Sequence, residues 1–339
     1  MEKIKTKILK EIAKSPKNVW EILEKSDFLL KDSIDALKNL YRDGLIESKK
    51  GKISLTKKGR SLINKKSLDL EPELCHICLG KRIVLNEKLK ELLKEYKKIV
   101  KERPLPTEKF FQGYMQEFDV IARVAFMQYN NDLEEKKIIL IGDDDLLSIA
   151  LALTNLPSRI LVLDIDERIG SFIEKVSKKH KFKIEFQEYN VAEPLPKKFL
   201  GKFDVFSSEP LETLTALKAF VLRGVSALKE NSSGYFGLTH AEASIKKWLE
   251  IEKFLTRMNC VITDLIPGFS VYPTTYGDLT YENFVKRLPF KVSENKGINW
   301  YKSALFRFEV LEKSKISNLN KEMRIEFVDE KEDITFPGY

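Results

Sequence analysis

Three consecutive aspartates, Asp143–Asp145, follow a single glycine at the end of an apolar stretch in the sequence IILIGDDDLLSIA. A strand that turns through glycine into a helix usually holds a nucleotide, because backbone N–H groups at the helix N-terminus attract its phosphates. Three carboxylates in that loop would repel a phosphate. The loop also lacks a GxGxxG motif and a GK[ST] motif. The sequence therefore argues against a dinucleotide enzyme and against a P-loop NTPase.

Acidic and polar residues also follow the other apolar stretches of this region. They are Asp164, Asp166 and Glu167; Glu188, Tyr189 and Asn190; Ser207, Ser208 and Glu209; and Thr239, His240 and Glu242. Ligands of open α/β sheets bind where the carboxyl ends of parallel strands meet, so we expect these side chains to surround one site. A single acid at a helix N-terminus is an ordinary cap, but three in succession exceed what capping needs.

A nucleoside without phosphates, held at its ribose by Asp164, fits such a site, and S-adenosyl compounds add a positive sulfonium. A methyltransferase must also bind the carboxylate of S-adenosylmethionine, which needs hydrogen-bond donors. An aminopropyltransferase uses decarboxylated S-adenosylmethionine, which ends in an ammonium group, and its acceptor is a polycationic amine. The aspartate cluster therefore favours aminopropyl transfer, and methyl transfer stays the alternative.

Alternating strands and helices are expected to position these residues. Strands are predicted at 138–142, 159–166, 183–190, 202–210 and 233–239, with helices between them and later strands in CVITDLIPG and SALFRFEVL. This order over residues 107–312 predicts a doubly wound, Rossmann-like parallel sheet in an α/β domain. Residues 313–339 are highly charged and are predicted to form a flexible tail or a lid.

Residues 1–66 have a pattern typical of a winged-helix domain. Three helices, the last ending at Gly44, precede a hairpin centred on Lys50-Gly51 in LIESKKGKISLTKKG. Such a domain can contact DNA through its third helix and hairpin, or it can dock against other domains and pair subunits. The third helix, KDSIDALKNLYRDG, mixes acids with bases, so we favour docking over nucleic acid binding.

Residues 67–106 are predicted to form a connector with a charged helix from Asn86 to Lys101. Its Cys75 and Cys78 have the C-x-x-C spacing of half a zinc site, but no second C-x-x-C follows, and a tetrahedral site needs four ligands. We therefore predict no metal cofactor. Half a site that a second subunit completes stays an alternative.

The composition indicates a cytoplasmic protein with more than one domain. The chain has 339 residues, of which 43% are hydrophobic. No apolar run approaches the roughly 18 residues of a membrane span, and the N-terminus lacks a secretory signal. The Lys and Glu usage is typical of thermophiles. The net charge of +8 is assigned to solvated helix faces rather than to nucleic acid binding.

Long stretches of the chain resemble the branched-chain polyamine synthases of archaea and bacteria, the N(4)-bis(aminopropyl)spermidine synthase family. The matching segments are FFQGYMQEF, LIGDDDLLSIALALTNLPSRILVLDIDERI, FDVFSSEPLETLTALKAFVLRG and YFGLTHAEASIKKWLEIEKFL, with the Cys pair and the N-terminal domain. The resemblance implies transfer of aminopropyl groups from decarboxylated S-adenosylmethionine to N4 of spermidine, giving N(4)-aminopropylspermidine and then the branched bis product. Glu209-Pro210 departs from the aspartate-proline pair expected after the fourth strand.

The resemblance also implies roles for individual residues. By matching position, Asp143, Asp144 and Asp145 form the catalytic motif. Within it our own hypothesis takes Asp144 or Asp145 as the principal carboxylate and Asp143 as an anchor for the donor or the helix backbone. Similarity to linear spermidine synthases implies that Gln112 contacts the donor tail. The expected donor-binding residues are Gln112, Gly142, Asp164, Asp166 and Asn190, and the expected acceptor-binding residues are Glu117, Tyr189, Ser208, Glu209 and Glu242. We expect a homodimer, and a DNA-binding regulator is the non-enzymatic alternative.

Overall fold

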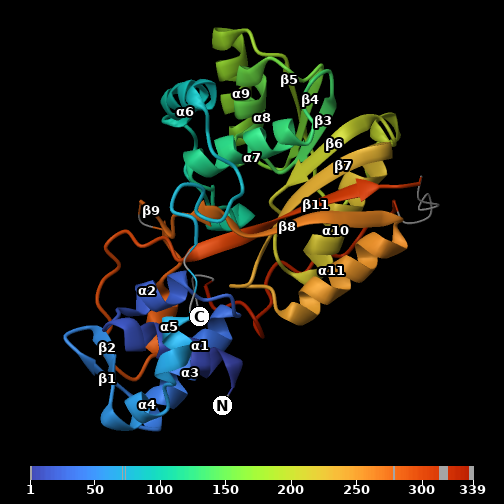
Figure 1. Ribbon diagram of the computed structural model, residues 1–339. Coiled ribbons are helices and arrows are strands. Elements are labelled where there is room, and N and C mark those ends of the chain that lie inside the picture. The colour runs from blue at the N-terminus through green and yellow to red at the C-terminus, as the bar shows by residue number, and fades with distance from the viewer. Residues whose placement is uncertain (1, 71, 73, 278, 313–319, 336–339) are drawn as a thin grey trace.

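A seven-stranded sheet forms the centre of the larger part of the molecule (Figure 1). The computed structural model describes residues 2–312 and 320–335, except 71, 73 and 278. In sheet order the strands are β5 (Ile184–Glu188), β4 (Arg159–Asp164), β3 (Lys137–Ile141), β6 (Phe203–Ser208), β7 (Leu228–Thr239), β11 (Tyr301–Val310) and β8 (Cys260–Tyr272). The strands from β5 to β7 are parallel, which confirms the predicted Rossmann-like sheet over most of its width.

β11 runs in the opposite direction to the parallel strands of the sheet. It lies between β7 and β8 and is antiparallel to both. Helices join β3 to β4, β4 to β5 and β6 to β7, and the short η2 (Lys197–Phe199) lies between β5 and β6. The described residues of the connection from β8 to β11 form only β9 (Thr275–Tyr276), β10 (Leu279–Thr280) and η3 (Asn283–Arg287). Along this connection the chain returns in the opposite direction, as in a long hairpin. The predicted Rossmann-like sheet is therefore mostly parallel, with β11 as its antiparallel strand.

Helices cover both faces of the sheet. α7 (Glu117–Tyr129), α8 (Leu147–Thr154) and α9 (Glu167–His180) lie on one face, with α6 (Glu87–Val100) against α7 and α8, and α10 (Leu214–Ala227) and α11 (Ile245–Arg257) lie on the other. Ile138 and Leu140 of β3 belong to the apolar core on the face covered by α7, α8 and α9. Ile139 and Ile141 belong to the core on the face covered by α10 and α11. A strand buried on both sides needs an unbroken apolar run. Among the described residues, no helix has the length and apolarity to cross a membrane.

The N-terminal unit contains three helices and a two-stranded hairpin. Its elements are α1 (Lys3–Lys14), α2 (Val19–Glu24), α3 (Leu30–Arg42), β1 (Ile46–Lys49) and β2 (Lys52–Leu55), and the short α4 (Lys57–Ser61) and α5 (Lys65–Asp69) follow. Lys50 and Gly51 both have positive φ, 52° and 76°, as a two-residue type I′ turn requires. The three helices and the hairpin therefore form where the sequence predicts them.

Trp20 docks the N-terminal unit onto the segment between β8 and β11. Its ring meets Phe284 edge-on, with 6.0 Å between the centroids, and its indole N–H donates to the carbonyl of Ser293 at 2.8 Å. Trp300 and Ile334 belong to the same apolar core. The beginning of the chain, the β8–β11 connection and the end of the chain thus share one core.

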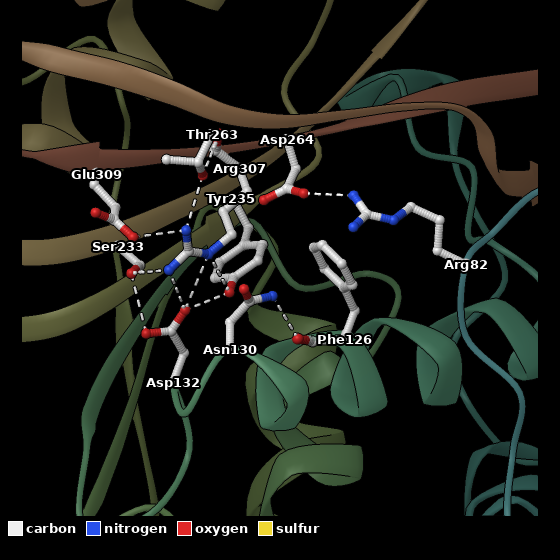
Figure 2. Close-up of polar contacts among 10 residues, drawn as sticks. All are labelled: Arg82, Phe126, Asn130, Asp132, Ser233, Tyr235, Thr263, Asp264, Arg307 and Glu309. Atoms are coloured by element: carbon white, nitrogen blue, oxygen red, sulfur yellow. Dashed lines mark hydrogen bonds and ion pairs between the residues drawn. The ribbon is translucent and has the colours of Figure 1, made fainter.

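A buried charged cluster fastens β11 to β7 and to the loop after α7 (Figure 2). The guanidinium of Arg307 lies 3.2 Å from Asp132 and donates to the hydroxyls of Ser233 and Tyr235, each at 3.0 Å. Its third nitrogen donates to Thr263 at 2.8 Å. A buried ion pair avoids a large desolvation cost only when its remaining hydrogen-bonding groups also have partners. Here they do, so the antiparallel strand is held in a fixed register.

Residues 320–335 cross the molecule close to the carboxyl ends of the parallel strands. The side chain of Asn320 accepts the N–H of Leu195 at 2.7 Å. The rings of Phe327 and Phe111 are stacked, with 5.9 Å between the centroids, and Lys247 pairs with Asp329 at 2.9 Å. The sequence predicts a tail or a lid over 313–339, of which 313–319 and 336–339 lie outside the described residues.

Candidate active site

Two adjoining cavities open at the carboxyl ends of the parallel strands. The first, which we call the acidic cavity, has among its lining residues Glu108, Asp144, Glu209, Glu212, Glu242, Asp333, Tyr272, Tyr281 and Tyr301. The second, which we call the apolar cavity, has among its lining residues Ile141, Gly142, Leu163, Asp164, Tyr189, Asn190, Val191, Phe220, Ile325 and Phe327. Both are lined by Phe111, Gln112, Asp144, Glu209 and Leu211. The wall between them therefore carries two carboxylates.

Asp143 serves the backbone of the aspartate turn. The preceding Gly142 has φ of 77°, a conformation that favours glycine. The Asp143 carboxylate accepts the N–H of Ser148 at 3.2 Å and so caps α8, and its own N–H donates to the carboxylate of Asp164 at 2.8 Å. Asp143 is 2% exposed and lines neither cavity.

Asp144 is the member of the trio that lines both cavities. One of its oxygens accepts the N–H of Gly113 at 3.2 Å. Burial, followed by the neighbouring charge of Asp145, raises the pKa of the Asp144 carboxyl well above its ordinary value. Because its carboxyl lines both cavities, Asp144 can act on a ligand from either side.

Asp145 lies behind this wall and holds two other segments. Its carboxylate accepts the N–H of Met115 at 2.5 Å, and its carbonyl accepts the hydroxyl of Tyr96 from α6. Burial and the charge of Glu209 raise the pKa of Asp145 to about 7, although Arg123 acts in the opposite direction. Asp145 therefore fixes the loop that contains Gln112 while adding negative charge to the junction.

Glu209 follows β6 and is held by a guanidinium and a phenol. Arg123 of α7 donates to one Glu209 oxygen and to the hydroxyl of Ser270, the latter at 3.1 Å. The hydroxyl of Tyr272 donates to the other oxygen. A Cβ at Gly237 would lie 1.8 Å from this carboxylate. The glycine in β7 thus makes the room that a glutamate needs at a position where the family resemblance leads us to expect an aspartate.

Two further carboxylates line the acidic cavity away from the shared wall. One Glu212 oxygen accepts the N–H of Thr239 at 2.7 Å, and the other is buried without a hydrogen-bond partner in the described part of the chain. Glu242 accepts the hydroxyl of Thr335 at 2.8 Å. Burial and the charge of Asp333 raise the pKa of Glu242 to about 8. A buried carboxylate oxygen that lacks a donor fits a ligand that brings its own N–H groups.

The apolar cavity combines aliphatic and aromatic walls with a few polar groups. Asp164 ends β4 and accepts the N–H groups of Asp143 and Asp166, both at 2.8 Å. The Asn190 side-chain oxygen accepts the N–H of Ala192 at 3.0 Å, which orients its amide. Phe111 and Phe327 belong to the cavity wall. A flat apolar group with polar edges fits such a site.

The structure brings eight sequence-predicted residues into the cavity walls and leaves five outside. The former are Gln112, Gly142, Asp144, Asp164, Tyr189, Asn190, Glu209 and Glu242, and the latter are Glu117, Asp143, Asp145, Asp166 and Ser208. Glu117 pairs with Arg103 at 2.9 Å. Asp166 accepts the side-chain amide of Gln112 at 2.9 Å, and Ser208 donates to the main chain of β3 at 2.6 Å. Asp166 and Ser208 therefore support residues of the cavity walls.

Several wall or supporting residues did not emerge from the sequence: Arg123, Glu212, Tyr272, Tyr301 and Asp333. The two tyrosines are paired across β8 and β11, and that pairing was not predicted. A lone arginine in the apolar run VIARVAFM was a usable signal for Arg123, because a buried guanidinium needs a carboxylate partner.

Comparison with known proteins gives a consistent set of relatives. A family model described as the branched-chain polyamine synthase A C-terminal domain matches residues 91–335. The N(4)-bis(aminopropyl)spermidine synthases of Thermococcus kodakarensis and Thermus thermophilus are 39% and 34% identical, covering 88% and 91% of this chain and 85% and 88% of theirs. The crystal structure of the Thermus thermophilus branched-chain polyamine synthase in complex with N4-aminopropylspermidine and 5′-methylthioadenosine has a TM-score of 0.84 at 32% identity. The superposition covers 97% of this chain and 92% of the Thermus thermophilus chain.

The raised pKa of Glu242 predicts a pH-dependent loss of stability. The folded state holds this pKa at about 8, above the unfolded value near ~4.3, so folding favours the protonated carboxyl. Its contribution is complete below about pH 4 and is lost as the pH rises through about 8. We therefore expect the stability of Glu242→Gln relative to the native protein to be greater at about pH 9 than at about pH 6. The expected increase is roughly 1–3 kcal/mol, because cavity water screens part of the charge.

Urea denaturation of the ligand-free proteins at both pH values measures this gain. Glu250→Gln on α11 is the matched control, because Glu250 is half-buried, pairs with Lys253 and lies outside both cavities. An advantage of Glu242→Gln that is the same at both pH values would contradict the assignment.

Proposed function

Since the chain belongs to the branched-chain polyamine synthase family, we propose that it transfers aminopropyl groups from decarboxylated S-adenosylmethionine to N4 of spermidine. The first transfer gives N(4)-aminopropylspermidine, the second gives N(4)-bis(aminopropyl)spermidine, and each releases methylthioadenosine. The observation that carries this proposal is the wall between the two cavities, where Asp144 and Glu209 face both. Two cationic substrates that react with each other need adjoining sites with negative charge at their meeting point.

The apolar cavity suits the nucleoside donor. Each oxygen of Asp164 accepts one backbone N–H and keeps a lone pair for a ribose hydroxyl. Asn190 presents its amide to the adenine edge, and the backbone at Gly142 allows close approach. Gln112, oriented by Asp166, lines the shared wall, where the aminopropyl chain and its ammonium group would lie.

The acidic cavity suits a polyamine acceptor. Glu212 has a buried oxygen without a donor in the described part of the chain, and Glu242 lines the same cavity, so these two bind one terminal ammonium group of spermidine. Tyr272 and Tyr301 provide aromatic and hydroxyl surfaces along the same cavity and attract alkylammonium groups. With one end of the acceptor held there, its central nitrogen is presented to the shared wall.

Asp144 is the carboxylate that we assign to chemistry. The lone pair of the acceptor nitrogen attacks the carbon next to the sulfonium, the C–S bond breaks, and its electron pair remains on sulfur as the thioether of methylthioadenosine. A free amine has a pKa near ~10 and arrives protonated, so a base must take one proton before or during attack. The raised pKa of Asp144 makes its ionised form a stronger base than an ordinary aspartate.

The second transfer needs charge stabilisation in addition to proton removal. Its nucleophile is a tertiary nitrogen, and its product is a quaternary ammonium that has no proton to lose. The carboxylates of Asp144 and Glu209 then stabilise the positive charge that stays on nitrogen. Asp143 and Asp145 act as positioning residues, one through the cap of α8 and the other through the loop at Met115.

The N-terminal unit fits a winged-helix domain used for docking in a cytoplasmic homodimer. The backbone N–H of Leu30, at the start of α3, donates to the carbonyl of Ala241 at 3.1 Å, and the amine of Lys31 donates to the carbonyl of Lys331 at 2.8 Å. The helix that would enter a DNA groove is thus engaged at its first turn with the catalytic domain, which supports docking over DNA binding.

The proposed reaction is tested by incubating the full chain with spermidine and either decarboxylated or intact S-adenosylmethionine. Mass spectrometry should show one and then two aminopropyl additions, with equimolar methylthioadenosine, from the decarboxylated donor only. Methyl addition from the intact donor would support the methyltransferase alternative. The absence of methylthioadenosine with every polyamine offered would overturn the proposal.

Asp144→Asn should abolish most turnover while leaving the fold intact. The substitution removes the base at the shared wall, and one general base typically contributes ~10²–10⁴-fold to a rate, so we expect kcat to fall by at least ~100-fold. Steady-state kinetics and thermal unfolding measure the two effects. Asp35→Asn on the surface of α3, where Asp35 pairs with Lys38, is the control and should keep native kcat. Near-native kcat in Asp144→Asn would show that another group removes the proton.

Glu212→Gln should weaken the acceptor without affecting the donor. The amide is neutral and places an N–H₂ group or a neutral oxygen where an ammonium would bind. The loss of one charge-assisted hydrogen bond, worth roughly 1.5–3 kcal/mol, should raise the KM for spermidine about 10- to 100-fold. The KM for the donor, measured in the same preparation, is the internal control. A rise in both KM values would indicate a general disturbance of the site.

A further inference from the structure

Arg223 of α10 is a buried cation whose charge is met by neutral oxygens. Its side chain is fully buried. In the described part of the chain its guanidinium donates to the carbonyls of Val191 and Ala192 at 3.2 and 3.3 Å. It also donates to the carbonyl of Lys321 at 2.6 Å and to the side-chain oxygen of Asn320 at 3.2 Å. A buried charge without a carboxylate partner is costly unless several acceptors compensate it, so an arginine here indicates that joining these acceptors matters.

The acceptors of Arg223 belong to two segments that are distant in the sequence. One is the loop after β5, residues 190–195, and the other is the segment 320–335, which we call the C-terminal strap. The two segments also bond directly to each other, because the side-chain amide of Asn320 accepts the N–H of Leu195 at 2.7 Å and donates to its carbonyl at 2.9 Å. Arg223 therefore ties a loop and a strap that already touch to the helix α10.

Both segments form walls of the apolar cavity. The cavity is lined by Asn190 and Val191 from the loop and by Ile325 and Phe327 from the strap. Phe220, one turn before Arg223 in α10, lines the same cavity, whereas Arg223 does not. The guanidinium therefore acts on a ligand through the walls that it joins, and those walls come from three separate parts of the chain.

A second anchor holds the other half of the strap. The amine of Lys247, in α11, lies 2.9 Å from Asp329 and 3.1 Å from Glu332. Asp333 and Thr335, which follow these two acids, line the acidic cavity and not the apolar one. The strap is thus fastened at one point beside each cavity, and the two points can be tested separately.

We propose that Arg223 is a positioning residue for the nucleoside donor, which it serves by holding the loop after β5 and the C-terminal strap together as one wall. Since the proposed function assigns this cavity to the donor, the role of Arg223 rests on that function. A ligand that meets walls already joined does not have to order them, and such preorganisation raises affinity. The planar fork of an arginine can donate to four oxygens at once, whereas a lysine offers a single nitrogen.

Calorimetry with methylthioadenosine on the full chain, in the absence of acceptor, tests this role. Arg223→Lys keeps the charge but offers one nitrogen in place of the fork, and Arg223→Met offers none. We expect the Kd for methylthioadenosine to rise roughly 10- to 100-fold, equivalent to the loss of one hydrogen bond to a charged group, with the larger rise in Arg223→Met. The KM for the decarboxylated donor should rise by a similar factor, whereas kcat at saturating donor and the KM for spermidine should stay native.

Asn320→Ala removes the strap side of the joint without touching α10, and it should weaken methylthioadenosine binding in a chain with native circular dichroism. Lys247→Met is the matched control: it should keep the native Kd for methylthioadenosine and raise the KM for spermidine. Native binding of methylthioadenosine by both Arg223→Lys and Asn320→Ala would overturn the inference alone. An equal loss in Lys247→Met would overturn it too, because any loosening of the strap would then suffice. Failure of the native chain to bind methylthioadenosine would overturn the proposed function and, with it, this inference.

Discussion

Buried negative charge in excess of buried positive charge governs the site. Asp143, Asp145 and Asp164 are each at most 6% exposed, and Arg123 gives its guanidinium to Glu209 and Ser270. Like charges crowded away from water cost free energy unless protons or a cation compensate them. Burial and neighbouring negative charges raise the pKa of the carboxyls of Asp143, Asp144 and Asp164. A bound polyamine compensates this negative charge, so part of its affinity comes from the relief of repulsion.

The aspartate motif shows how one residue type takes three roles. A positive φ at Gly142 and another at Leu146 fold the motif so tightly that consecutive side chains leave in different directions. Asp143 caps a helix, Asp144 lines both cavities, and Asp145 holds a neighbouring loop and the hydroxyl of Tyr96. The backbone of the turn therefore determines which role each aspartate has, because the three side chains are chemically identical.

Local patterns in the sequence predict most of the fold and the position of the site. Apolar runs locate β3 to β7, and the acids after them locate the edge at which ligands bind. Long-range pairing escapes such patterns: the antiparallel placement of β11 depends on the course of the β8–β11 connection. Tyr272 and Tyr301 reach the acidic cavity only through that pairing. Glu212 resembles any surface acid in sequence, and its buried oxygen becomes evident only in three dimensions.

The docking of Trp20 has a consequence for how the protein is made. Its hydrogen bond to Ser293 spans 273 positions, so nearly the whole catalytic domain must be translated before this contact can form. At the usual ~5–20 residues per second, the N-terminal unit waits on the order of tens of seconds with its docking face exposed to solvent. During that interval it must stay soluble as an independent body. Its own compact core of apolar residues from α1, α2 and α3 therefore matters to the nascent chain before it matters to the finished enzyme.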